Sequence, residues 1–139
     1  MNSNFIRPSI ATTLRFATIA TAIGLFAPIS ALAAQNWPTP RANQASTGST
    51  DTSLPNDLQV LWEFKAQEAV EATPVIVDGT VYVADAMGML YAVDAASGQE
   101  RWRLETELGF TSGPAIANGL LVIGDLDGKV YGVDAQTGK

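Results

Sequence analysis

The stretch that decides the fold is AVDAASGQERW, which runs from Ala92 to Trp102. Apolar and smaller residues alternate up to Val93, as at the end of a β-strand, and Trp102 belongs to the next apolar run. Between them, Asp94 is suited to cap backbone N–H groups, and Gly98 adopts a positive φ without steric strain. The stretch therefore predicts a strand, a tight turn and a second strand.

The same pattern returns further along the chain, where 132–139 read GVDAQTGK. With Pro74 placed over Pro114, the two segments align without a gap, and ten of the 26 aligned pairs are identical. The identical pairs are Pro74 and Pro114, Ile76 and Ile116, Gly79 and Gly119, Asp85 and Asp125, Gly88 and Gly128, Tyr91 and Tyr131, Val93 and Val133, Asp94 and Asp134, Ala95 and Ala135, and Gly98 and Gly138. A register kept over this length indicates two copies of one structural unit.

Each unit is predicted to hold short antiparallel strands. In the first unit they cover residues 74–77, 80–85, 89–94 and 100–105. Asp78-Gly79 and Asn118-Gly119 are favoured two-residue hairpin turns. Four short strands in a unit of about 40 residues are typical of a β-propeller blade. The predicted fold class is therefore all-β, with about two blades of four antiparallel strands, preceded by a signal peptide.

The same offset, applied backwards from Trp102, falls on Trp62, so the run VLWEFK at 60–65 is predicted to be a fourth strand without its three partners. In a ring, such a strand completes the last blade and removes an exposed sheet edge. The predicted organisation is a signal peptide at 1–33, an extended arm at 34–58 and a partial propeller at 59–139. The propeller part comprises the closing strand 60–65, a blade at 74–105 and a partial blade at 114–139.

The second copy of the motif ends at Lys139, before its tryptophan. We therefore expect an N-terminal fragment of a longer reading frame. Assembly of several short chains into a ring is the alternative. In the arm, Trp37 is the one bulky residue of the stretch NWPTPRAN, and its side chain is expected to anchor the arm on a neighbouring domain.

The pattern A-x-D-x-x-[S/T]-G-x-x-x-W, carried by Ala92, Asp94, Ser97, Gly98 and Trp102, resembles the tryptophan-docking repeat of propellers of the pyrroloquinoline quinone (PQQ) type. The resemblance covers residues 60–139, and the arm NWPTPRAN is similar to the segment before the first blade of exported bacterial members. The second copy departs from the pattern by having Gly132 in place of the alanine. In that family the tryptophan packs between neighbouring blades. The resemblance thus implies architectural roles for Asp94, Gly98, Trp102, Asp134, Gly138 and Trp62.

The resemblance implies one of two functions. Quinoprotein dehydrogenases hold PQQ and calcium at the centre of an eight-bladed ring and oxidise alcohols or sugars. Other members, similar to the outer-membrane assembly lipoprotein, use the ring as a binding surface and hold no cofactor. The blade motif fits both, and no catalytic, cofactor or metal ligand of the family can be assigned to a residue of this chain.

The amino-acid composition excludes several classes of catalytic and metal site. The sequence has no cysteine and no histidine, which excludes Cys or Ser–His nucleophiles, zinc–thiolate sites and a lipidated cysteine within this chain. The net charge of −6 argues against nucleic acid as a partner. We therefore expect a non-catalytic scaffold without a cofactor, which binds a protein, a ligand or the remaining blades of a longer chain. The alternative is the N-terminal part of a PQQ-dependent alcohol or sugar dehydrogenase, with PQQ and calcium as its cofactors.

Two acidic patterns have alternative interpretations. Asp125-Leu126-Asp127-Gly128 is reminiscent of a calcium loop, but the first ligand would fall at Ile123, which cannot coordinate a metal, so a hairpin turn is preferred. Asp85 and Asp125 occupy one repeat position. They are either a carboxylate pair at the ring or, as we expect from their recurrence, caps of their own turns.

The segment 1–33 has the features of a secretory signal peptide. Arg7 and Arg15 precede the apolar run FATIATAIGLFA at 16–27, and Ala31-Leu32-Ala33 supplies a small-x-small cleavage site. Cleavage after Ala33 is predicted, with Ala34 as the alternative. The mature protein is then exported to the periplasm or the extracellular space and has no membrane span. An uncleaved leader would instead be an anchor, and would admit a third class, the sensor domain of a membrane-bound signalling protein.

Overall fold

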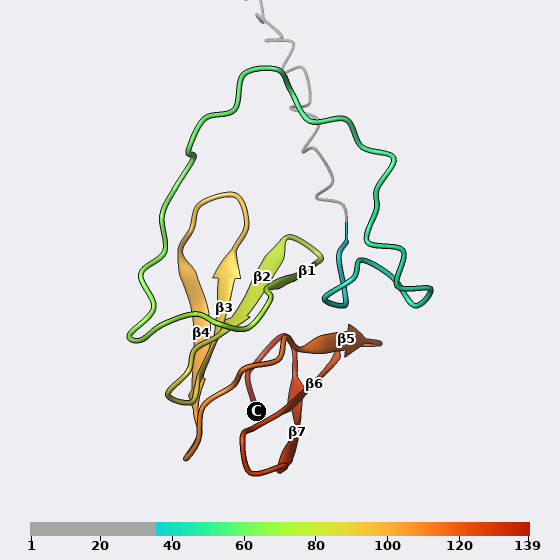
Figure 1. The fold of residues 1–139 in the computed structure, drawn as a ribbon. Coiled ribbons are helices and arrows are strands. Elements are labelled where there is room, and N and C mark those ends of the chain that lie inside the picture. The colour runs from blue at the N-terminus through green and yellow to red at the C-terminus, as the bar shows by residue number, and fades with distance from the viewer. Residues whose placement is uncertain (1–35) are drawn as a thin grey trace, which may run out of the picture.

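The computed structural model describes residues 36–139, so the predicted signal peptide at 1–33 lies outside the described residues. Within them the chain is all-β, as predicted, and forms two antiparallel sheets (Figure 1). The first sheet has the order β1-β2-β3-β4, with β1 at Val75–Val77, β2 at Thr80–Ala84, β3 at Met89–Asp94 and β4 at Glu100–Glu105. The second has the order β5-β6-β7, with β5 at Ala115–Ala117, β6 at Leu120–Gly124 and β7 at Val130–Asp134. We call them blade 1 and blade 2.

The two blades repeat one register. Thr80 pairs with Asp94 in blade 1, and Leu120 pairs with Asp134 at the equivalent positions of blade 2. The predicted hairpin turns are present, since Asp78 and Asn118 have φ of 48° and 51° and the glycine after each is also at positive φ. The sequence repeat is therefore a repeat of strand pairing and of turn conformation.

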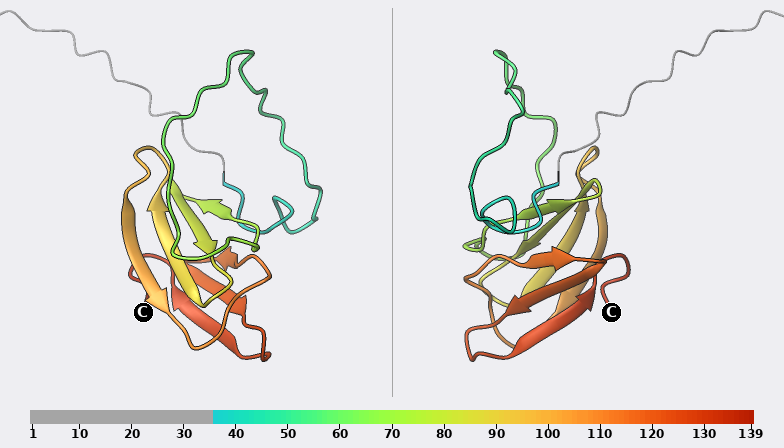
Figure 2. Two further views of the ribbon diagram at one scale, coloured as in Figure 1. Left: turned by 60° about the vertical axis from the view of Figure 1, so that its left-hand side comes forward. Right: turned by 90° about the vertical axis from the view of Figure 1, so that its right-hand side faces the viewer.

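A hydrophobic core joins the facing sides of the two blades, which lie next to each other in Figure 2. Phe110, in the segment that connects the blades, is fully buried in this core. Buried side chains of blade 1 and blade 2 surround it, namely Val75, Tyr82, Ala84, Leu90, Ala92, Ile116, Leu121, Ile123 and Val133. Since neither sheet can bury this face alone, each blade depends on its neighbour for stability.

The opposite side of blade 1 carries a second apolar cluster, formed by Val83, Met89, Tyr91 and Val93. Residues 60–65 lie over this cluster, and Trp62 and Phe64 pack against it. Exposed and half-buried residues alternate along the segment, as they do in a strand with one buried face. It pairs with no strand in the described part of the chain.

The arm ties the first strands of the two blades together. Trp37 and Ile76 of β1 exchange two backbone hydrogen bonds, with N···O distances of 2.6 and 2.9 Å. The next carbonyl, that of Pro38, accepts a hydrogen bond from Ile116 N of β5 at 2.9 Å. The arm thus adds one extended strand-like segment to the edges of β1 and β5, after which a wide loop leads to residue 60 (Figure 1). Residues 36–139 include no helix of the length and hydrophobicity that crossing a membrane requires.

Candidate functional site: the joint between blades

Trp102 of β4 connects blade 1 to the last turn of blade 2. Its indole Nε1 donates a hydrogen bond to the carbonyl of Ala135 at 3.0 Å. The Tyr82 hydroxyl donates to the same carbonyl at 3.0 Å, and the Tyr82 and Trp102 ring centroids are 5.9 Å apart. The indole also lies against Gly138, where a Cβ would be 2.8 Å from the ring. One carbonyl of blade 2 therefore accepts two side-chain donors from blade 1.

Trp62 makes the same contact one repeat earlier. Its Nε1 donates to the carbonyl of Ala95 at 2.9 Å, and its ring lies against Gly98. Tryptophan and acceptor are separated by 33 residues in both cases. Residues 60–65 therefore dock on blade 1 in the way that β4 docks on blade 2, through a tryptophan on the last turn of the blade.

The turn that receives each indole is organised by an aspartate. Asp94 Oδ1 accepts hydrogen bonds from Ala96 N, Ser97 N and Ser97 Oγ, and Asp134 Oδ1 accepts the same three from Gln136 and Thr137. The carbonyl of Ala95 or Ala135, which follows the aspartate, is thereby presented to the tryptophan. Each repeat-motif residue of the sequence analysis lies at one of these two joints.

The environment of Asp94 favours its ionised form. Arg101 Nη2 lies 2.6 Å from Asp94 Oδ2, and together with the hydrogen bonds from Ser97 it holds the pKa of Asp94 well below its ordinary range. The pKa of Asp134 is also lowered, mainly by the hydrogen bonds from the Thr137 side chain and backbone. The ionised carboxylate is thus the form that organises both turns.

The lowered pKa of Asp94 predicts acid sensitivity. An unfolded aspartate titrates near pH 3.9, so this group stabilises the fold above that pH, and the contribution is lost as the pH falls towards the folded-state pKa. Between pH 7 and pH 3, we expect the melting temperature of Asp94→Asn to fall less steeply than that of the parent. Asp57→Asn, in the exposed arm, is the control, and parallel curves for parent and Asp94→Asn would contradict the account.

Gly98 is predicted to be needed for two separable reasons. Its φ is +72°, and a Cβ would lie 2.7 Å from the Trp62 ring. Gly79 has a similar φ of +69° with nothing within 4 Å of a Cβ. Gly98→Ala should therefore cost about 1–3 kcal/mol more unfolding free energy than Gly79→Ala, which incurs conformational strain alone. Chemical denaturation measures both, and equal losses would show that the indole does not pack on this turn.

At the other end of each blade, Asp85 and Asp125 cap their own turns. Asp85 Oδ1 accepts from Met87 N and Met89 N, while Oδ2 accepts from the Tyr91 hydroxyl at 3.1 Å. Asp125 makes the equivalent three bonds within blade 2. The carboxylates are thus engaged within their own turns, as the capping interpretation expects. Residues 36–139 contain no group of three or more His, Cys, Asp or Glu side chains able to hold a metal ion.

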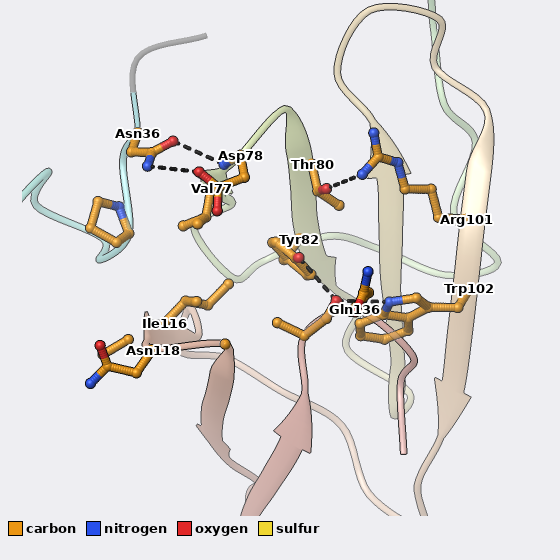
Figure 3. Close-up of a pocket in the computed structure, with 14 residues that line it drawn as sticks. Asn36, Val77, Asp78, Thr80, Tyr82, Arg101, Trp102, Ile116, Asn118 and Gln136 are labelled. Carbon is orange, nitrogen blue, oxygen red and sulfur yellow. Dashed lines mark hydrogen bonds between the residues drawn. The ribbon is translucent and has the colours of Figure 1, made fainter. Parts of the chain in front are cut away.

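A pocket of about 630 Å³ lies beside the Trp102 joint (Figure 3). The arm supplies Asn36 and Pro38 to its wall, and the two blades supply Val77, Asp78, Thr80, Tyr82, Arg101, Trp102, Ile116, Ala117, Asn118, Gly119, Ala135 and Gln136. Asn36 is fixed to the first hairpin turn, since its Oδ1 accepts from Asp78 N at 2.9 Å and its Nδ2 donates to Asp78 Oδ1 at 3.2 Å. Sequence reasoning missed this contribution of the arm, and Asn36 carried no repeat signal that would have revealed it.

The sequence is similar to parts of two quinoprotein dehydrogenases. A quinohemoprotein alcohol dehydrogenase from Comamonas testosteroni is 29% identical over 92 residues, which cover 61% of this chain and 13% of that protein. The quinoprotein glucose dehydrogenase of Escherichia coli (strain K12) is 32% identical over 95 residues, covering 58% of this chain and 12% of that protein. The matches therefore span only a small part of the length of these relatives.

Solved structures show the same fold. The crystal structure of the Comamonas testosteroni enzyme matches with a TM-score of 0.67 and 28% identity, over 76% of this chain and 18% of that one. BamB from Moraxella catarrhalis matches with a TM-score of 0.53 and 22% identity, over 56% and 25% of the two chains, a likeness of fold alone. Residues 54–139 match the family described as outer membrane protein assembly factor BamB. The chain therefore belongs to this family of PQQ-repeat β-propeller proteins.

Proposed function

We propose that this chain supplies consecutive blades of an exported propeller ring, and that the ring is a non-catalytic scaffold which binds a protein or a ligand. The observation that carries the proposal is the repeated joint, in which Trp62 and Trp102 each donate to a carbonyl 33 residues ahead. In this proposal Asp94, Gly98, Trp102, Asp134, Gly138 and Trp62 are architectural. They align each blade with the next and take part in no reaction.

Residues 60–65 are proposed to complete another blade of the ring. Trp62 docks on blade 1 as Trp102 docks on blade 2, and β4, which carries Trp102, pairs through its backbone with β3 of its own blade. By the same geometry, residues 60–65 present a backbone edge to the third strand of another blade. The apolar side chains of Val60 and Leu61 are 78% and 85% exposed, as expected of a segment that such a blade would cover.

The proposed location is the periplasm or the extracellular space. Support comes from the leader at 1–33, which has the order of charged, apolar and small residues that signal peptidases recognise. Mass spectrometry of the mature protein tests this directly. An N-terminus at Ala34 or Gln35 is expected, whereas an intact leader would place the protein on a membrane instead.

The alternative is the N-terminal part of a PQQ-dependent dehydrogenase. It is favoured by the identities of 29% and 32% to two quinoprotein dehydrogenases. The donor set of residues 36–139 does not fit the family's calcium ion, because these residues offer no cluster of three or more acidic side chains. We therefore assign no residue of this stretch as a calcium ligand.

Reconstitution of the full-length gene product distinguishes the two functions. The purified protein is incubated with PQQ and calcium, and dye-linked oxidation of ethanol, butanol and glucose is followed together with the quinone absorbance. The scaffold proposal predicts no turnover and no retained quinone after gel filtration. Calcium-dependent turnover with stoichiometric quinone would overturn it in favour of the dehydrogenase.

A further inference from the structure

The arm is hydrogen-bonded to the blades through very few residues. Residues 36–38 make the backbone hydrogen bonds to Ile76 and Ile116, and Asn36 adds its two bonds to Asp78. The following turn is held mainly by bonds within itself, such as Arg41 Nε to Ser46 O and Asn43 Nδ2 to Thr47 Oγ1. Residues 49–61 are exposed throughout. The hydrogen bonds of the attachment are therefore mostly those of a short strand, and Pro40 adds a packing contact with Gly113, where a Cβ would lie 3.1 Å from its ring.

Main-chain hydrogen bonds to a strand edge are available to any extended peptide. In this mode of recognition the backbone supplies affinity, and neighbouring pockets for side chains supply specificity. Both parts are present here. Ile76 and Ile116 offer the edge, and the 630 Å³ pocket opens directly beside Pro38.

The pocket has polar groups left for a ligand. The side-chain amides of Asn118 and Gln136 have no hydrogen-bond partner among residues 36–139, whereas Arg101 is engaged by Asp94 and Thr80. Tyr82 and Trp102 provide aromatic surface, and Gln136 lines the same pocket (Figure 3). The one acidic and the one basic side chain of the pocket wall already have partners, since Asp78 is bonded to Asn36 and Arg101 to Asp94. The wall therefore suits an uncharged segment that has an apolar residue and an amide or hydroxyl group able to form a hydrogen bond.

We propose that the edges of β1 and β5 form a binding site for an extended, uncharged peptide segment of a partner protein, and that arm residues 36–38 are its resident occupant. The partner segment replaces the arm, pairs with Ile76 and Ile116, and places a side chain in the pocket next to Trp102. This inference rests on the proposed scaffold function and names the partner's chemistry. It also gives the arm a role as an internal competitor, since binding requires its release.

The test uses the full-length gene product and a fluorescent peptide with blocked ends and the uncharged sequence of arm residues 36–40, NWPTP. Asn36→Ala removes two hydrogen bonds of the resident arm, so the peptide is expected to bind this variant about tenfold more tightly than the parent. Asn56→Ala, at an exposed asparagine with no bond of this kind, is the matched control and should leave affinity unchanged. A peptide methylated at the Trp37 backbone nitrogen cannot donate to Ile76 O, and should lose most of its binding.

An arm with a purely structural role gives a different result. Asn36→Ala would then lower stability with no gain in peptide affinity, which overturns the proposal. Equal binding of the methylated and unmethylated peptides would overturn it as well, as would dimerisation of Asn36→Ala by exchange of arms between copies. Failure here is distinguishable from failure of the scaffold proposal, which depends on the reconstitution with PQQ and calcium.

Discussion

Trp102→Ala is expected to lower the free energy of unfolding of the full-length gene product by about 3–5 kcal/mol. The substitution removes a large aromatic ring from the joint between the blades, together with the hydrogen bond to Ala135 O. It also exposes Tyr82, which packs against the indole at 5.9 Å between centroids. Urea denaturation followed by circular dichroism measures the change.

Trp102→Phe separates packing from hydrogen bonding at this joint. A phenyl ring preserves much of the apolar contact, and the Ala135 carbonyl still accepts from the Tyr82 hydroxyl. The lost hydrogen bond is expected to lower the free energy of unfolding by about 1 kcal/mol, in addition to the loss that comes from the smaller ring. A loss below about 1 kcal/mol for Trp102→Ala itself would show that the tryptophan does not hold the blades together.

Asp85→Ala is expected to cost about 3–5 kcal/mol, because it leaves two buried donors and one partly buried donor without their acceptor. Asp85 is fully buried and accepts from Met87 N, Met89 N and the Tyr91 hydroxyl. Its backbone carbonyl also accepts from Phe110 N, at the centre of the core between the blades. The loss should appear in equilibrium unfolding as a lower midpoint with an unchanged slope.

The arm supplies a control in Asp57→Ala. Asp57 is exposed, so its removal frees no buried donor. We expect this variant to change the unfolding free energy by less than about 0.5 kcal/mol. Equal losses at the two positions would contradict the argument that unsatisfied buried donors set the cost of Asp85→Ala.

The blades were predictable because their sequence occurs twice, and the joints because the repeated motif resembles the tryptophan-docking motif of PQQ-type propellers. Pro74 over Pro114 defines the offset, and the strand limits found in blade 1 differ from those predicted only at Pro74 and Asp85. Asp85 ends its strand early because its carboxylate turns back to cap Met87 and Met89. Subtracting the same offset from Trp102 locates Trp62, whose docking geometry matches.

The arm was not predictable in the same way. Residues 36–48 have no repeat partner and no periodicity, and their contacts join the arm to β1 and β5, which are distant from it in the chain. The sequence predicts a side-chain anchor at Trp37, but it gives no sign of the bridge that the Trp37 backbone forms with Ile76. Such main-chain pairing depends on tertiary placement, because any non-proline residue can make it.

For residues 60–65 the sequence predicts the conformation of the segment and not its strand partner. The β-prone run VLWEFK and the repeat offset predict a strand, and in the structure Trp62 and Phe64 of this segment pack against blade 1. A strand, however, also needs a neighbouring backbone, and none of the described strands pairs with this segment. A sequence pattern predicts which side chains of a segment are buried. It does not predict which neighbouring strand forms the backbone hydrogen bonds.

The central claim is that one tryptophan joint recurs along the ring, and hydrogen exchange of the indole N–H groups tests it most directly. In the full-length gene product labelled with 15N-tryptophan, signals are assigned by single Trp→Phe substitutions. The Nε1–H groups of Trp62 and Trp102 donate to Ala95 and Ala135, whereas that of Trp37 has no acceptor among residues 36–139, which makes it an internal reference. We predict slow exchange for Trp62 and Trp102 and fast exchange for Trp37. Exchange of Trp62 as fast as that of Trp37 would contradict the repeated joint, and with it the ring.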